Sequence, residues 1–141
     1  MSPNKAAGIA TLVLLLSALL VADSLSRSDF GPAIRAILVM ALGSLAAGLL
    51  YGVAWGWKGL AMCIAIAFTY TAAAFVEIVL RPPRFVGRDA VPEPRFSEGD
   101  AAFLAGLGGI SLLLALIGGV VGAVLRGVVG AILHRRHKRP R

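Results

Sequence analysis

Long runs of apolar residues, separated by short polar stretches, dominate the chain. They predict helices over about 6–25, 33–57, 59–80 and 99–133; the first run itself covers 6–22 and ends before Asp23. A helix needs about 20 predominantly apolar residues to cross the hydrocarbon core of a bilayer. The pattern therefore predicts an all-α integral membrane protein. We expect a bundle of four transmembrane helices that forms a single membrane domain over residues 1–141, without a β-sheet.

The polar stretches predict how these helices are connected. Residues 23–32 form a short loop, and residues 57–59 form a tight turn that predicts an antiparallel hairpin of the second and third helices. The loop 81–98 holds four prolines, which favour an extended and semi-rigid chain. Its end, Ser-Glu-Gly-Asp at 97–100, is typical of a capping box that starts a helix. A basic tail, 134–141, follows the last run.

The first apolar run has one alternative interpretation, a cleaved signal peptide. A single early lysine, Lys5, precedes the run and Asp23 follows it. The position three residues before a cut at Asp23 is Leu20, whereas signal peptides carry a small residue there. We therefore expect this run to be an uncleaved helix.

Composition supports a membrane environment. The chain is 58% hydrophobic and 15% charged, whereas soluble domains are roughly 45–50% apolar and about 25% charged. A soluble fold of this size would expose large apolar patches, and lipid as the solvent removes that cost. The single cysteine, Cys63, lies inside an apolar run and is expected to be a small buried hydrophobic residue.

Charged residues predict the orientation in the membrane. The amino end, the tight turn and the tail carry eight basic residues, and the opposite side carries six. All seven acidic residues lie on that opposite side or at its edge: Asp23, Asp29, Glu77, Asp89, Glu93, Glu98 and Asp100. Because basic residues favour the cytoplasmic side, we expect a multi-pass protein of the cell membrane with both termini in the cytoplasm.

Small residues recur at four-residue spacing in two of the predicted helices. The rows are Ser44, Gly48, Gly52 and Gly56 in the second helix, and Ala115, Gly119, Ala123 and Gly127 in the fourth. A parallel row in the fourth helix contains Gly118 and Gly122. Residues four apart share one face of a helix, and small residues there let two backbones approach closely within lipid. We therefore predict small-xxx-small packing ridges, which meet either a helix of the same chain or a helix of a partner.

Two charged residues within the apolar runs are candidates for function. Glu77 lies one turn before Arg81, so an ion pair at the helix end is favoured over a proton or ion pathway. Arg126 interrupts the fourth run, which as one helix would be about 50 Å long at ~1.5 Å per residue. Either the helix leaves the membrane near Arg126, or its side chain reaches the interface from within; a substrate-binding arginine is a third hypothesis.

The basic tail is predicted to contact anionic lipid headgroups. Its charges are Arg135, Arg136, Lys138, Arg139 and Arg141. Because they follow a hydrophobic segment, we favour membrane lipids over an acidic partner and do not expect nucleic acid. The two histidines also lie in this tail, outside the apolar runs where a haem ligand would be needed.

Catalytic, cofactor and metal-binding motifs are missing from the sequence, so we expect a protein that is not an enzyme and has no cofactor. The polar side chains within the apolar runs are few: Thr11, Ser17, Ser44, Thr69, Tyr70, Thr71, Glu77, Ser111 and Arg126. The first hypothesis is therefore a small non-catalytic accessory or assembly subunit of a larger membrane complex, in contact with other membrane subunits. The alternative is a small homo-oligomeric transporter, channel or lysis-type pore, for which this lining is thin.

Overall fold

The computed structural model describes residues 2–26, 30–80, 85–86, 91–92 and 98–137. These form the helices α1 (Pro3–Ser26), α2 (Phe30–Trp55), α3 (Met62–Leu80) and α4 (Glu98–His137), with a 3-10 helix η1 (Gly56–Ala61) between α2 and α3. Three stretches of the described chain are long and apolar enough to cross a membrane: 3–25, 34–80 and 98–134. The predicted all-α class, with helices able to span a membrane, is confirmed. The middle stretch contains both α2 and α3, and a count of four spans stays a prediction.

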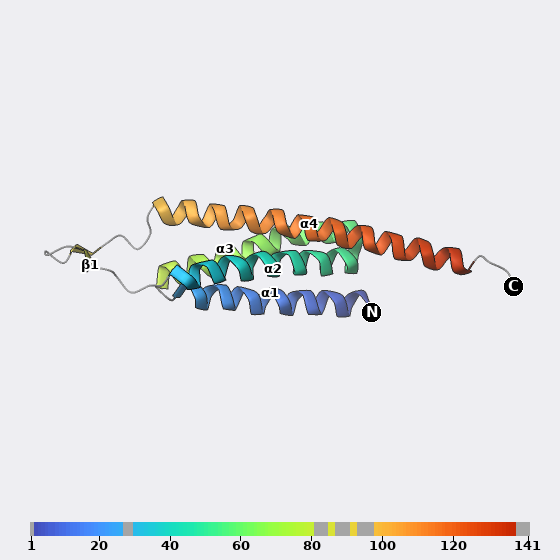
Figure 1. Ribbon diagram of the computed structural model, residues 1–141, viewed down its shortest axis with the longest axis horizontal. Helices are drawn as coiled ribbons and strands as arrows, with labels where there is room; N and C mark the ends of the chain where they lie inside the picture. Colours follow the sequence, from blue (N-terminus) through green and yellow to red (C-terminus); the bar gives the residue numbers. More distant parts are fainter. Residues whose placement is uncertain (1, 27–29, 81–84, 87–90, 93–97, 138–141) are drawn as a thin grey trace.

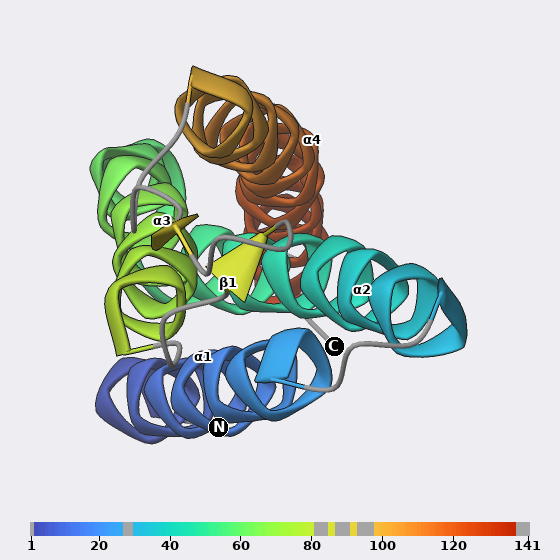
Figure 2. The same cartoon turned by 90° about the vertical axis from the view of Figure 1, so that its left-hand side faces the viewer.

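The helices lie side by side and alternate in direction, with α2 and α4 running one way and α1 and α3 the other (Figure 1). Seen end-on, α1 and α4 lie on opposite sides of the pair formed by α2 and α3 (Figure 2). In the described chain α1 and α4 each contact α2 and α3, and α2 packs most extensively on α4. The core therefore sits between α2 and α3, with α1 and α4 closing its two sides.

A tight turn at 57–59 was predicted, and the connection is somewhat longer. The 3-10 helix η1 covers Gly56–Ala61 and begins at Gly56, whose φ is 61°. This left-handed conformation is strained for residues with a Cβ and free of strain for glycine, which is why helices often end at a glycine. Gly56 thus ends α2 and turns the chain into the hairpin.

The prediction that the chain lacks a β-sheet is wrong in one detail. Two-residue strands, β1 (Phe85–Val86) and β2 (Val91–Pro92), pair antiparallel in the loop between α3 and α4. Extended backbone was expected from the prolines of this loop, and two extended segments joined by a short connection can exchange ladder hydrogen bonds. Ser97 and the rest of that loop lie outside the described residues.

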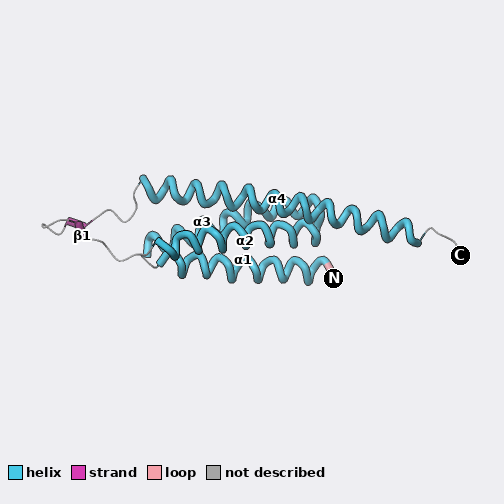
Figure 3. The backbone as a smooth tube through the Cα atoms, in the orientation of Figure 1, coloured by secondary structure: helices cyan, strands magenta, loops and turns pink. Residues whose placement is uncertain are grey.

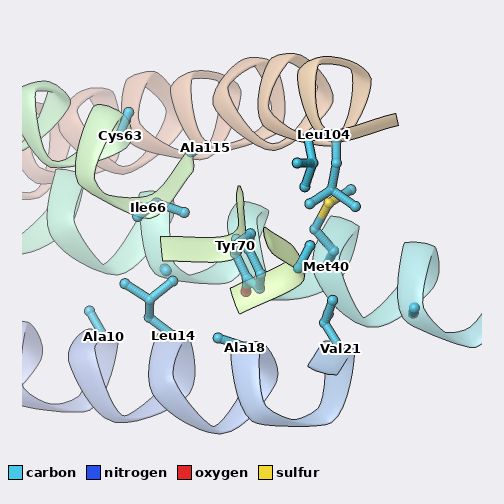
Figure 4. Packing of buried hydrophobic residues seen from close by; sticks show 14 of the residues in the cluster. Ala10, Leu14, Ala18, Val21, Met40, Cys63, Ile66, Tyr70, Leu104 and Ala115 are labelled. Carbon is cyan, nitrogen blue, oxygen red and sulfur yellow. The ribbon is translucent and has the colours of Figure 1, made fainter. Parts of the chain in front are cut away.

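The core is built mainly of small and medium side chains. Tyr70, Met40 and Ile66 are the largest fully buried ones, and alanines fill much of the remainder. Figure 4 shows Tyr70 among buried side chains of the surrounding helices. Large apolar residues such as Leu19, Leu42 and Phe68 are instead more than half exposed on the outer surface. This distribution, bulky outside and small inside, is what lipid-facing helices with close contacts require.

Candidate functional site

Four hydroxyl groups, one from each α-helix, are linked across the middle of the bundle. Ser17 Oγ of α1 lies 2.5 Å from Tyr70 Oη of α3. The Tyr70 hydroxyl also hydrogen-bonds the side chain of Ser44 in α2. Ser44 Oγ in turn lies 2.8 Å from Ser111 Oγ of α4. This set, which we call the hydroxyl chain, connects α1 to α4 although those two helices do not touch each other.

Each member of the hydroxyl chain is buried and paired. Tyr70, Ser44 and Ser111 are fully buried and Ser17 is 8% exposed. Ser17 Oγ also lies 2.7 Å from the Val13 carbonyl, one turn earlier in α1. A serine hydroxyl has one proton to donate. If Ser17 donates it to the Val13 carbonyl, Ser17 accepts the hydrogen bond that Tyr70 donates, and no hydroxyl needs to donate twice. Among the described residues, every buried side-chain nitrogen or oxygen has a hydrogen-bond partner.

Gly43 provides the space for the hydroxyl chain. A Cβ at this position would lie 2.6 Å from Ser17 Oγ and would collide with Tyr70 Oη. Sequence reasoning identified the four hydroxyl residues as isolated polar groups in apolar runs and overlooked both their connection and Gly43. A signal was present, since Gly43 directly precedes Ser44 in α2. Contacts between residues as far apart as Ser17 and Tyr70 are invisible to local spacing.

The predicted small residues of α2 and α4 lie opposite one another. A Cβ on Gly48 would collide with the Ala115 carbonyl, and one on Gly52 with the Gly119 carbonyl. Together with the pair Ser44–Ser111, these contacts define a parallel register in which α2 and α4 advance in step. The backbones therefore approach so closely that only small residues fit between them.

The second small row of α4 faces the same helix. A Cβ on Gly118 would collide with the Leu45 carbonyl, and one on Gly122 with the Leu49 carbonyl. Gly119, in the first row, also faces Leu60 and the buried Cys63, whose Sγ would lie 3.3 Å from an added Cβ. The rows of α4 thus meet neighbours within the chain, a choice that the sequence left open between this chain and a partner.

The last residues of the two predicted rows, Gly56 and Gly127, do not lie against the backbone of the other helix. Gly56 ends α2, and its nearest neighbour for an added Cβ is Arg126 Cδ at 3.7 Å. A Cβ on Gly127 would meet no atom of the described chain within 4 Å. Ala123, by contrast, is buried, and its backbone nitrogen would lie 2.9 Å from a Cβ on Gly52. The contact between the two helices, which we call the α2–α4 seam, therefore extends from Ser44 and Ser111 to Gly52 and Ala123.

Arg126 contacts the end of α2. Its guanidinium donates a hydrogen bond to the Ala54 carbonyl, one of the last carbonyls of that helix. Such carbonyls lack a partner within their own helix and carry the negative end of the helix dipole, so a cation there is favourable. The geometry supports a structural role at the end of α2, near the level where Trp55 and Trp57 are exposed.

The remaining predicted residues stay apart from the hydroxyl chain. Glu77 is half-buried near the end of α3, and its expected partner Arg81 lies outside the described residues. Arg135 and Arg136 belong to the last turn of α4, whereas Lys138, Arg139 and Arg141 lie outside the described residues. In the described part of the chain, no three His, Cys, Asp or Glu residues gather as a metal site would require.

Comparison of the chain with protein-family models, curated proteins and solved structures found no match. The arrangement itself must therefore indicate function. Paired hydroxyls and helix backbones in contact can hold the relative positions of the helices. Neither feature resembles a nucleophile with its base, for which an activating His, Lys or carboxylate within hydrogen-bond reach would be needed.

Proposed function

We propose that this protein is a non-catalytic accessory or assembly subunit of a larger membrane complex. It crosses the membrane four times, with both termini in the cytoplasm, and the small-residue rows of α2 and α4 hold the bundle together. The observation that carries the proposal is how the polar and small residues of the bundle are used. Among the described residues each buried side-chain nitrogen or oxygen has a hydrogen-bond partner, and the α2–α4 seam brings backbone against backbone.

Paired polar groups favour assembly over transport, because a transport path needs polar groups that face a cavity. The hydroxyl groups of Ser17, Ser44 and Tyr70 instead face one another. These hydroxyl groups lie at one level of the bundle, because they hydrogen-bond one another across the helices. Ser111 lies at the same level, since it pairs with Ser44 in the parallel register of α2 and α4. Hydrogen bonds between helices at one depth hold the helices together. A conduction path would instead need polar groups along the length of the helices.

One observation favours the alternative, a homo-oligomeric transporter or pore. A second polar contact, Thr11 Oγ1 to Tyr51 Oη at 2.8 Å, joins α1 and α2 nearer the start of α1. Two polar levels at different depths could belong to a path that opens in another conformation. The experiment below therefore distinguishes the two functions directly.

Purification in a mild detergent from the cells that make the protein tests the proposal. We expect other membrane proteins to copurify at fixed stoichiometry, measured by native mass spectrometry. A matched preparation of the variant Gly122→Leu, whose side chain would separate α2 from α4, should lose them. A lone homo-oligomer of defined size would overturn the proposal in favour of the transporter or pore.

A further inference from the structure

The side chain of Arg126 is held where α2 ends and the chain turns into η1. Its guanidinium donates a hydrogen bond to the carbonyl of Ala54, the residue before the end of α2 at Trp55. Its Cδ would lie 3.7 Å from a Cβ on Gly56, the residue with positive φ that begins η1. Arg126 therefore reaches from α4 to the hairpin of α2 and α3 and brings its positive charge to the turn.

The 3-10 helix η1 lies along this part of α4. Gly56, its first residue, lies near Arg126, whereas Cδ2 of Leu60 would lie 2.7 Å from a Cβ on Gly119, two turns earlier in α4. Residues three apart share a face of a 3-10 helix, so Trp57 lies on the same side of η1 as Leu60 and one turn nearer Arg126. Trp57 is 65% exposed. An exposed indole thus lies beside the turn that the Arg126 side chain crosses.

The described chain has no carboxylate at this end of the bundle. Lys58, the residue after Trp57, is exposed and adds a second positive charge beside Arg126. The acidic residues of the described chain lie near the ends of α1 and α3 or in the first turn of α4: Asp23, Glu77, Glu98 and Asp100. Those element ends lie together, opposite the end where α2 stops (Figures 1 and 3). The described chain therefore supplies no counter-ion for the charges at the turn.

The contact with Ala54 uses only part of the Arg126 guanidinium. This group carries five N–H donors in a planar fork, and one of its nitrogens, Nη1, donates to the Ala54 carbonyl. Arg126 is otherwise exposed, so its other donors are open to a further acceptor. The fork matches the oxygens of a phosphate, which accept two parallel hydrogen bonds. The carbonyl thus fixes the position of a group that an anion can bind.

A phospholipid headgroup is the anion that this location favours. The hairpin of α2 and α3 lies within one long apolar stretch, 34–80, and η1 is its turn. If both helices cross the membrane, the turn lies at one of its two faces. Exposed tryptophan beside basic residues is the pattern of a membrane interface, where the phosphates of the headgroups lie. Basic pockets between membrane helices bind anionic headgroups on the cytoplasmic side.

We propose that Arg126, Trp57 and Lys58 form a binding site for the phosphate of an anionic phospholipid. Arg126 donates hydrogen bonds to the phosphate oxygens, Lys58 adds a positive charge, and the apolar body of Trp57 lies against the lipid. A lipid bound here connects α4 to the hairpin of α2 and α3. The inference goes beyond the accessory role and depends only on α2 and α3 crossing the membrane, so copurification and cysteine labelling test those two proposals separately.

Tryptophan fluorescence tests this site, because Trp55 and Trp57 are the two tryptophans of the chain and both lie at the turn. The whole protein is reconstituted in phosphatidylcholine vesicles, in which rising fractions are replaced by brominated phosphatidylglycerol or brominated phosphatidylcholine. Bromine quenches tryptophan at close range, so the two curves give the relative occupancy by anionic and zwitterionic lipid. We expect a preference of about fivefold or more for the anionic lipid, since each basic residue near the surface contributes about that factor. Equal quenching by both lipids would overturn the proposal.

A pair of variants separates the site from general surface charge. Arg126→Gln keeps an amide that can donate to the Ala54 carbonyl and removes the charge, so it should lower the preference about fivefold. The matched control Lys5→Gln removes one charge at the same end of the bundle, but from α1, which does not contact α4. It should leave the preference unchanged, because charges more than ~8 Å apart are largely screened at physiological salt. Equal effects would contradict the site. If Arg126→Gln loses its helical circular dichroism, Lys58→Gln replaces it with the same expectation.

Two further arms identify the source of the phosphate and exclude the basic tail. Inorganic phosphate, added at constant ionic strength, should leave the quenching by brominated phosphatidylglycerol unchanged, because acyl chains as well as the headgroup hold a lipid. Relief of quenching would assign the site to free phosphate and overturn the lipid assignment. The double variant Arg135→Gln, Arg136→Gln should also keep the preference, since these residues follow Arg126 by about 14 Å or more along α4. Loss of the preference in this variant would place the lipid contact in the tail instead.

Discussion

At the scale of single residues, one glycine and one tyrosine decide how the middle of the bundle is built. Tyr70 places a hydroxyl in the core, where an unpaired polar group would be costly. Ser17 and Ser44 pair with it from two other helices. Gly43 leaves the space in which this meeting occurs. Position 43 therefore requires a glycine because the Tyr70 hydroxyl group occupies the space that a Cβ would fill.

The coupling predicts a non-additive pair of substitutions. Gly43→Ala should destabilise the protein by about 1–3 kcal/mol, because the new methyl group overpacks the contact with Tyr70 and Ser17. Tyr70→Phe should cost about 0.5–1 kcal/mol, as hydrogen bonds between membrane helices generally do. In the Tyr70→Phe background, Gly43→Ala should cost less, because the oxygen that it meets is gone.

Unfolding of each variant in detergent micelles, followed by circular dichroism against increasing SDS, measures this coupling. Gly106→Ala is the matched control, since a Cβ there meets no described atom within 4 Å. The arrangement at Gly43 would be refuted by equal costs for Gly43→Ala and Gly106→Ala.

At the scale of elements, the α2–α4 seam is the most extensive contact between helices of the described bundle. Gly118 and Gly122 lie against carbonyl groups of α2, so the neighbour of each is backbone and not a movable side chain. A methyl group at either position can be accommodated only if the two helices separate. Separation would also pull Ser44 from Ser111, which ties the seam to the hydroxyl chain.

Alanine substitutions along α4 should therefore show a sharp boundary. Gly118→Ala and Gly122→Ala should each destabilise the bundle by about 1–3 kcal/mol, because the seam becomes overpacked. Gly127→Ala and Gly130→Ala should be nearly neutral, since an added Cβ meets no described atom there. All four changes are chemically identical, so each open position controls for a packed one.

The same SDS unfolding assay measures these four variants. Loss of stability at Gly127 equal to that at Gly122 would show that the contact continues past the end of α2. From sequence alone the four-residue row extends through Gly127, and in the structure its contacts within the chain end at Ala123.

At the scale of the whole molecule, the two ends of the bundle differ in charge. Lys5, Lys58 and Arg126 lie at the end where α1 begins and α2 stops. Glu98 and Asp100 lie in the first turn of α4, at the opposite end. The positive-inside rule then predicts that the end with Lys58 faces the cytoplasm.

Cysteine labelling in intact cells checks the orientation and the number of spans. On a Cys63→Ala background, single cysteines are introduced at positions 5, 58, 90 and 138. A membrane-impermeant thiol reagent should modify position 90 and leave the other three unmodified until the cells are opened. The reverse pattern would invert the orientation, and labelling that separates 5 from 138 would require an odd number of spans.

The class of this protein can be read from its amino-acid sequence alone. Run lengths and composition predict helices that can span a membrane, because a bilayer tolerates few other backbone conformations and sets the length of each helix. The placement of the charged residues predicts the orientation of the protein in the membrane, because basic residues favour the cytoplasmic side. The small-residue rows are also legible, since their four-residue spacing is a local property of one helix.

Which side chains contact one another depends on how the helices pack in three dimensions. Ser17 and Tyr70 are far apart in the chain, and their contact depends on how α1 and α3 are rotated and shifted along each other. Arg126 binds the end of α2 because the parallel register places it there, a fact that its position within an apolar run does not reveal. The sequence also does not show that α4 continues past the end of α2, because this depends on the register between the two helices (Figure 1). Local spacing determines the face of a helix, whereas register and rotation between helices arise from packing the whole bundle together.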